Sequence, residues 1–320
     1  MQNKNYVSIL LLLLCQTLCA MGTFSKSDYH FIENDHSVAL YKDKTLIWQF
    51  NYDQNLSKPY FHPISLVDGT VLTWESPPDH PWHHGLWFSW KDINGVNYWE
   101  EDRKTGQSKG KTDWSNVKVK KLSDASVQIT MDLDYHEPGQ SALLTEKRIM
   151  TISAPDASES YTINWISEFT AVADKVVLDR TPPPGQENGK SWGGYAGLSF
   201  RVCEGVKDAL YINTAGPKEL SGRYGGKSEV VEYSGLLGDT AFGIAILDHP
   251  NNLNSPSSWY LTAKGMHYFS PAVIFDKPHT MSKREKMTLK YRIIIHPERW
   301  DLNKLKEEHK LFIGDHIAGD

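Results

Sequence analysis

A histidine-rich stretch is the part of this sequence whose residue types best suit chemistry. Residues 77–85 read Pro-Pro-Asp-His-Pro-Trp-His-His-Gly, so Asp79, His80, His83 and His84 fall within six residues. The prolines exclude a regular helix and restrict the backbone. Because a restricted loop holds imidazole rings in fixed positions, the stretch predicts a site built from these side chains.

Three interpretations fit these residues. In the first, His80 and His83 form a proton-transfer pair, because imidazole titrates near neutral pH, and Asp79 and His84 contact the substrate. In the second, His80, His83, His84 and Asp79 bind a divalent metal ion, since zinc and non-haem iron sites combine histidines with a carboxylate. In the third, the histidines only hydrogen bond the loop backbone. We predict no cofactor unless the second interpretation holds.

Two further histidines precede prolines, in His62-Pro63 and in Asp248-His249-Pro250. A residue before proline adopts extended geometry, which places each histidine at a strand end, where loops carry functional groups. We therefore expect His62 and His249 to join the catalytic group by orienting the substrate, and Asp248 to bind its hydroxyl groups.

Aromatic and arginine residues supply candidate walls for a site. The chain has 11 tryptophans and 15 tyrosines, many of them beside glycine or proline. Apolar ring faces stack on the C–H faces of sugars, so Trp82, Trp99 and Tyr195 are predicted to contact substrate, whereas burial in the core is the alternative. Arg201 follows a glycine-rich run and is expected to bind a hydroxyl or carboxylate group, or else to form a salt bridge.

Composition and absent motifs narrow the function. The formal net charge is −5 and there is no basic stripe, which argues against nucleic-acid binding. We find no glycine-rich phosphate or dinucleotide loop, no G-x-S-x-G elbow and no H-E-x-x-H helix. Nicotinamide redox chemistry and zinc-peptidase chemistry are therefore disfavoured.

The elements that must position these residues are mostly strands. Apolar and polar residues alternate over 126–135, 161–170 and 287–295, which is typical of half-buried antiparallel strands. A single helix is expected over 302–312, capped by Asp301. We predict an all-β fold, an antiparallel β-sandwich or supersandwich with a short C-terminal helix.

The N-terminus has the anatomy of a secretory signal peptide. Lys4 precedes an apolar run at 7–14, and Ala20-Met21-Gly22 is a small-residue cleavage pattern. The run is shorter than the ~20 residues that span a bilayer, so the mature chain should carry no transmembrane span. We predict a signal peptide over 1–22 and a single β-sandwich domain over 23–320.

Cysteine positions agree with export. Cys15 and Cys19 would leave with the signal, although each follows a leucine and a lipoprotein anchor is the alternative. Only Cys203 remains, so no internal disulfide can form and stability must come from a large core. The expected location is periplasmic or secreted.

Several motifs resemble one bacterial family. Residues 60–63, 68–70, 78–87, 94–99 and 248–250 are similar to the PmoA-like domain family. The resemblance covers nearly all of the mature chain. One departure is the triplet His-His-Gly at 83–85, where the family pattern has His-Arg-Gly, so no role of that arginine is carried over.

The resemblance implies a fold similar to the galactose-mutarotase-like supersandwich and a role connected with carbohydrates. Members often occur in bacteria that consume polysaccharides, although the family's function is poorly established. Its name refers to a methane mono-oxygenase subunit, which needs several transmembrane spans that this chain lacks.

These observations favour an exported carbohydrate-active enzyme that uses acid/base chemistry on a sugar or oligosaccharide. Epimerisation, elimination and hydrolysis all fit, whereas no acidic pair suggests a two-carboxylate glycosidase. The alternatives are a non-catalytic sugar-binding module and a metal-dependent oxygenase or hydrolase.

Overall fold

The computed structural model describes residues 28–218, 223–262 and 265–314. The predicted signal peptide, residues 1–22, lies outside the described residues and stays a prediction, which N-terminal sequencing of the mature protein would test. Within the described ranges, no helix is long and apolar enough to cross a membrane.

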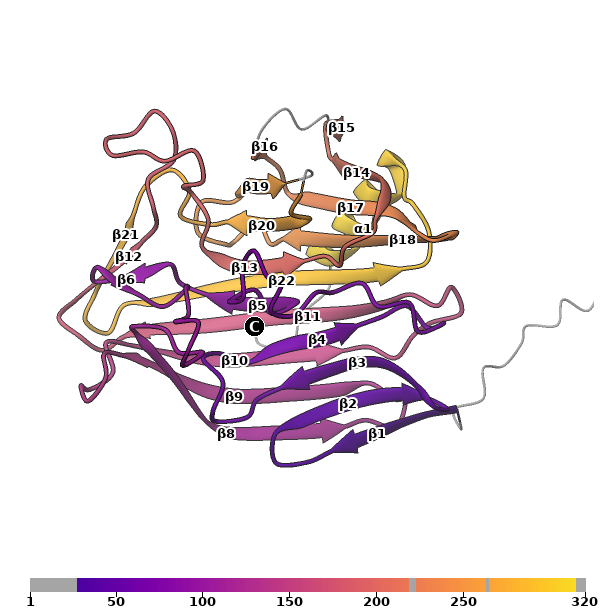
Figure 1. Ribbon diagram of the computed structural model, residues 1–320, viewed down its shortest axis with the longest axis horizontal. Helices are drawn as coiled ribbons and strands as arrows, with labels where there is room; N and C mark the ends of the chain where they lie inside the picture. The colour runs from indigo at the N-terminus through magenta and orange to yellow at the C-terminus, as the bar shows by residue number, and fades with distance from the viewer. Residues whose placement is uncertain (1–27, 219–222, 263–264, 315–320) are drawn as a thin grey trace, which may run out of the picture.

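Among the described residues, most strands belong to two nine-stranded antiparallel sheets, which lie against each other (Figure 1). The first sheet contains, in spatial order, β1 (Tyr29–Glu33), β2 (Ser37–Lys42), β3 (Thr45–Asn51), β4 (Tyr60–Ile64), β5 (Leu86–Ser89), β13 (Gly197–Arg201), β20 (Tyr268–Ala272), β19 (Ser258–Thr262) and β16 (Tyr224–Lys227).

The second sheet contains, in spatial order, β15 (Gly216–Lys218), β14 (Lys207–Asn213), β17 (Val230–Leu237), β18 (Thr240–Asp248), β22 (Lys286–His296), β11 (Tyr161–Ala171), β10 (Leu144–Ile152), β9 (Val127–His136) and β8 (Lys111–Lys121). A four-stranded sheet at one end combines β21 (His279–Ser282), β12 (Lys175–Asp179), β6 (Asp92–Ile93) and β7 (Val96–Asn97).

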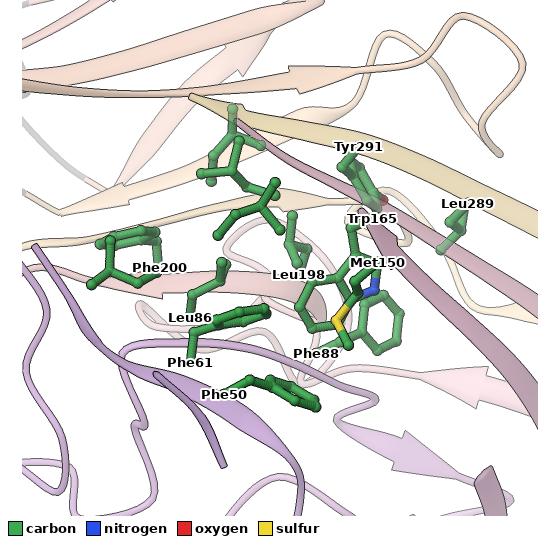
Figure 2. Close-up of a cluster of buried hydrophobic side chains, with 14 of the residues drawn as sticks. Phe50, Phe61, Leu86, Phe88, Met150, Trp165, Leu198, Phe200, Leu289 and Tyr291 are labelled. Atoms are coloured by element: carbon green, nitrogen blue, oxygen red, sulfur yellow. The ribbon is translucent and has the colours of Figure 1, made fainter. Parts of the chain in front are cut away.

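The main core fills the space between the two large sheets. Figure 2 shows Phe61 and Phe88 of the first sheet together with Met150 and Trp165 of the second, all in one buried cluster. Alternation along each strand decides which side chains enter it, because successive residues point to opposite faces. On β5, Phe88 faces this core, and Trp87 therefore faces away from it.

The helix α1 (Leu302–Gly314) covers part of the other face of the second sheet (Figure 1). Its Leu305 and Phe312 are buried against β17, β18 and β22, where Leu247 and Ile294 contribute to a second apolar cluster. The backbone amide of Lys304 donates to the side chain of Asp301 at 2.8 Å, which is the predicted N-cap.

This architecture confirms the predicted fold class, an all-β antiparallel sandwich with a short C-terminal helix. The predicted strands correspond to β9, β11 and β22, and the predicted helix to α1. Whether the mature chain forms a single domain stays a prediction.

Candidate functional site

The outer face of the first sheet carries a cluster of aromatic side chains away from the main core. Tyr60, Trp87, Tyr260 and Tyr268 come from β4, β5, β19 and β20, and Trp99 joins them from the loop after β7. A solvent-facing sheet surface would ordinarily be polar. This face is instead apolar and covered by loops.

A cavity of about 320 Å³ opens in this cluster, which is a size that suits a small ligand. Its walls come from β19, β20, the segments just before β16 and β20, and the three loops that precede β5, follow β7 and precede β13. The lining residues are His80, Trp82, His83, Trp99, Glu100, Trp192, Tyr195, Arg223, Tyr260, Met266 and Tyr268.

The loop before β5 is fixed by its own backbone. The amide of His80 donates to the carbonyl of Pro77 and that of His83 to the carbonyl of His80, each at 3.0 Å. At Gly85, where φ is +70°, a Cβ atom would lie 2.4 Å from the carbonyl oxygen of Phe61, so only glycine fits. The loop therefore holds His80 and His83 in place, as its prolines predict.

His80 is oriented by an ion pair between the exposed Asp79 and the buried Arg201. Its Nδ1 lies 2.9 Å from Asp79 Oδ2, and Arg201 Nη2 donates to both oxygens of Asp79 at 2.9 and 3.0 Å. Burial alone would raise the pKa of Asp79, but the His80 hydrogen bond and the Arg201 charge outweigh it and lower the pKa. The ionised Asp79 accepts a hydrogen bond from Nδ1 of His80. This leaves Nε2 of His80 to exchange protons with a substrate.

His83 is a buried platform beneath His80. Its ring stacks on His80 at 4.7 Å and on Tyr268 at 5.2 Å between centroids, and it lies 4.9 Å from Trp87. Burial, with the nearby charge of His80 next in size, lowers its pKa well below the ordinary value. His83 is therefore a neutral imidazole that extends the aromatic wall.

Glu100 places a carboxylate in the same cavity. Lys91 Nζ donates to Glu100 Oε2 at 2.6 Å, and the hydroxyl of Tyr195 donates to Oε1 at 3.1 Å. The side-chain amide of Asn97 also donates to Oε2. Burial raises the pKa of Glu100, but the Lys91 charge and these hydrogen bonds reverse the shift and lower it. The cavity therefore holds an ionised carboxylate.

Sequence reasoning missed Glu100. The available signal was Asn97, whose Oδ1 accepts the backbone amides of Trp99 at 2.8 Å and Glu100 at 3.0 Å. An asparagine that binds its own downstream backbone marks a fixed turn, and the carboxylate sits on that turn. Trp192, Arg223, Tyr260 and Met266 were also missed as wall residues.

Behind the cavity, His84 lies between two carboxylates. Its Nδ1 is 3.2 Å from Glu75 Oε1 and its Nε2 is 2.9 Å from Glu101 Oε1, while Lys58 Nζ binds Glu101 Oε1 at 2.5 Å. The ring stacks on Tyr60 at 4.7 Å. This group, Lys58, Glu75, His84 and Glu101, is called the cross-loop network below.

The charges in the cross-loop network follow from its contacts. Burial opposes ionisation of Glu101, but Lys58 and His84 lower its pKa to about 2. The His84 hydrogen bond likewise lowers the pKa of Glu75, against the effect of burial. Both carboxylates are therefore ionised and act only as hydrogen-bond acceptors. The network joins the loop of His83 to the loop of Glu100 through their sequence neighbours.

The predicted site residues therefore differ in their position relative to the cavity. His80, His83, Trp82, Trp99 and Tyr195 line the cavity. Asp79, Arg201 and His84 do not line it and instead support the residues that do.

His62 lies near His84 and Glu75 of the cross-loop network and does not line the cavity. Its Nδ1 is 2.9 Å from Thr73 Oγ1, and burial lowers its pKa. Asp248 and His249 lie elsewhere. Asp248 accepts from Asn252 at 2.7 Å and from the amide of Ser257 at 2.8 Å, and the His249 ring packs on Phe312 of α1 at 5.5 Å.

The proposed roles of Asp248 and His249 at a shared site are therefore not supported by their positions. A His-Pro pair can lie either under the helix or beside the aromatic face, and its local sequence does not decide between the two. In β18 the strand ends under the helix, whereas the loop before β5 ends over the aromatic face.

The metal interpretation required His80, His83, His84 and Asp79 to converge on one point. In the described part of the chain, no group of three or more histidine, cysteine, aspartate or glutamate side chains is arranged to hold a metal ion. His84 directs its two nitrogens to Glu75 and Glu101, and His80 directs Nδ1 to Asp79.

Comparison with known families gives one match. The model described as Family of unknown function (DUF6807) matches residues 37–310. No curated protein matches the chain. The name PmoA-like, suggested by the motifs, is not supported by these comparisons.

Solved structures give remote likenesses. An alpha-galactosidase from Lactobacillus brevis is 9% identical with a TM-score of 0.40, and the alignment covers 83% of this chain and 39% of that chain. The Slr1438 protein from Synechocystis sp. PCC 6803 is 8% identical over 93% of this chain and 100% of that one, with a TM-score of 0.38.

A galactose mutarotase related enzyme from Lactobacillus acidophilus is 8% identical over 85% of this chain and 99% of that one, with a TM-score of 0.27. Likenesses at these scores carry no argument about function. The chain spans 39% of the length of the alpha-galactosidase.

Proposed function

Because the chain belongs to the family of unknown function DUF6807, which assigns it no activity, we propose a function from the cavity itself. The protein binds a sugar or oligosaccharide and catalyses acid/base chemistry on it, as an isomerase, lyase or hydrolase. One observation carries the proposal: an imidazole and an ionised carboxylate, His80 and Glu100, line one aromatic cavity.

The walls suit a ligand that is apolar on its ring faces and polar at its edge. Trp82, Trp99 and Tyr260 offer ring faces for C–H groups, while Glu100 and Arg223 offer hydrogen bonds to hydroxyl groups. A flat aromatic ligand would use the faces but not the polar groups. A pyranose uses both.

The two titratable groups have complementary tasks. The ionised Glu100 takes a proton from the substrate or from a water molecule, and His80 gives a proton to the substrate oxygen that gains negative charge. Each group then returns to its starting state by exchange with solvent. Asp79 keeps Nδ1 of His80 engaged, so that Nε2 performs the transfer.

The experiment is a screen of monosaccharides and disaccharides by proton NMR, which detects epimerisation, elimination and hydrolysis in one spectrum. We expect turnover by the wild type and a loss of about 100-fold or more in kcat for Glu100→Gln, as for removal of a catalytic base. The control is Glu204→Gln, an exposed glutamate outside the cavity.

The result against catalysis is also defined. Tight binding of a sugar by the wild type, with no turnover of any sugar in the screen, would identify a non-catalytic binding module. Turnover that is unchanged in Glu100→Gln would remove Glu100 from the mechanism.

A further inference from the structure

Trp192 differs from the other tryptophans of the protein. Its side chain is 50% exposed, and in the described ranges every other tryptophan is buried or half-buried. An indole in contact with water forgoes the stabilisation that burial would give, so an exposed one in an otherwise buried set needs an explanation. Trp192 also lines the cavity, which places the exposed ring at the site.

The backbone around Trp192 is held in place. The amide of Gly193 donates to Lys190 at 2.9 Å and that of Gly194 to Thr181 at 2.8 Å. The hydroxyl of Tyr224 donates to the carbonyl of Gly193 at 3.1 Å. The exposed ring is therefore presented by an anchored segment.

Close packing adds to this anchoring. A Cβ atom at Gly193 would lie 2.1 Å from the carbonyl oxygen of Pro182, and one at Gly194 would lie 2.4 Å from the ring of Phe275. Both positions thus require glycine. A segment this closely packed keeps Trp192 at the cavity wall without a ligand to order it.

Trp192 and His80 belong to different parts of the wall. From His80, ring contacts lead to His83 at 4.7 Å, then to Tyr268 at 5.2 Å and then to Tyr260 at 5.7 Å between centroids. The Tyr260 hydroxyl lies 3.4 Å from the carbonyl oxygen of Trp192. Along this path, three rings, those of His83, Tyr268 and Tyr260, lie between His80 and the backbone of Trp192.

We propose that the cavity accepts a substrate of at least two linked rings, a disaccharide or larger glycoside, and that Trp192 is a specificity-determining residue that stacks on the unit beyond the one that reacts. This inference rests on the proposed function for the reacting unit. It adds the substrate class: one ring of the ligand lies at His80 and the next at Trp192, since both residues line the cavity and come from different loops.

The test compares matched ligands on matched variants. The probes are methyl glucoside and methyl galactoside against cellobiose, maltose, lactose and melibiose, with affinity measured by calorimetry on the full chain. We expect Trp192→Ala to weaken the best disaccharide about tenfold with no change for the monosaccharide, in line with the loss of one aromatic stacking contact. Trp192→Phe should retain most of the affinity.

The control is Leu311→Ala, which removes an equally exposed apolar side chain on α1, 52% exposed and outside the cavity. Its affinities should equal those of the wild type. If Trp192→Ala leaves the ratio of disaccharide to monosaccharide affinity unchanged, Trp192 does not contact the second sugar ring. If no disaccharide binds more tightly than its matched monosaccharide, the substrate class is wrong.

The two proposals fail separately. Turnover that depends on Glu100 but not on Trp192 would overturn only the second-ring contact. A dependence of disaccharide affinity on Trp192 with no turnover would overturn only the catalytic proposal.

Discussion

Two buried clusters in this protein pair a histidine with a glutamate, and their charges differ. In the cross-loop network, His84 and Glu101 are 2.9 Å apart, and Lys58 also binds Glu101. Beneath the start of α1, His296 Nε2 and Glu232 Oε1 are 3.7 Å apart, and no lysine or arginine reaches Glu232 within ion-pair distance in the described residues.

The pKa values follow from that difference. The pKa of Glu101 is lowered to about 2, although burial opposes its ionisation. Burial instead raises the pKa of Glu232 to about 7 and lowers that of His296 to about 3. His296 instead stacks flat on Trp300 at 3.8 Å between centroids. The glutamate is therefore charged in the first cluster and tends to be neutral in the second, because only the first has a buried lysine beside it.

Position in the fold separates the clusters as well. The cross-loop network adjoins the cavity and joins the loops of His83 and Glu100. The Glu232 cluster lies at the face that α1 covers, where it contacts Trp300. Of these two clusters, the one with the ionised glutamate adjoins the candidate site, and the one with the neutral glutamate lies where the helix packs.

The largest expected effect comes from removing the anion of the cross-loop network. Glu101→Gln leaves Lys58, whose side chain is 2% exposed, without its counter-charge. Loss of one partner of a buried ion pair costs about 3–5 kcal/mol, so we expect that decrease in the free energy of unfolding measured with urea at pH 7.

The matched control for that variant is Glu33→Gln, which breaks the exposed pair of Glu33 and Lys121 at 2.7 Å. An exposed pair contributes about 1 kcal/mol or less. Equal losses in the two variants would contradict the distinction between a buried and a surface pair.

A smaller effect is expected from Glu232→Gln, and it depends on pH. The folded pKa is about 7 and the ordinary value is 4.5, so the folded state binds the proton more tightly. The stabilisation that the folded state gains by binding this proton is fully present below pH 4.5. It is lost as the pH rises through 7. The variant should be more stable than wild type by about 3 kcal/mol at pH 8 and equal near pH 4.

Urea unfolding at both pH values measures this difference. The comparison with wild type isolates Glu232, because His296 is present in both proteins. A stability difference between variant and wild type that does not change with pH would contradict a neutral, buried Glu232.

The fold was largely predictable because period-two alternation is local. The strands β9, β11 and β22 and the capped helix α1 follow from spacing alone. The prolines around His80 likewise predicted a fixed loop.

The rest of the site depends on contacts between distant segments. Arg223, Tyr260 and Tyr268 reach the cavity through the pairing of β16, β19 and β20, which no local pattern specifies. For the same reason, the sequence gives no means of separating His80 from His249. Each is followed by a proline, Pro81 or Pro250, and the elements that surround the two histidines differ.

The most direct test of the central claim uses those two histidines. Turnover of the sugar found in the screen is measured for wild type, His80→Gln and His249→Gln, with folding checked by thermal unfolding. We predict that His80→Gln lowers kcat by about 100-fold and that His249→Gln stays within about twofold of wild type. An equal loss in both variants, or no loss in His80→Gln, would contradict a site centred on this cavity.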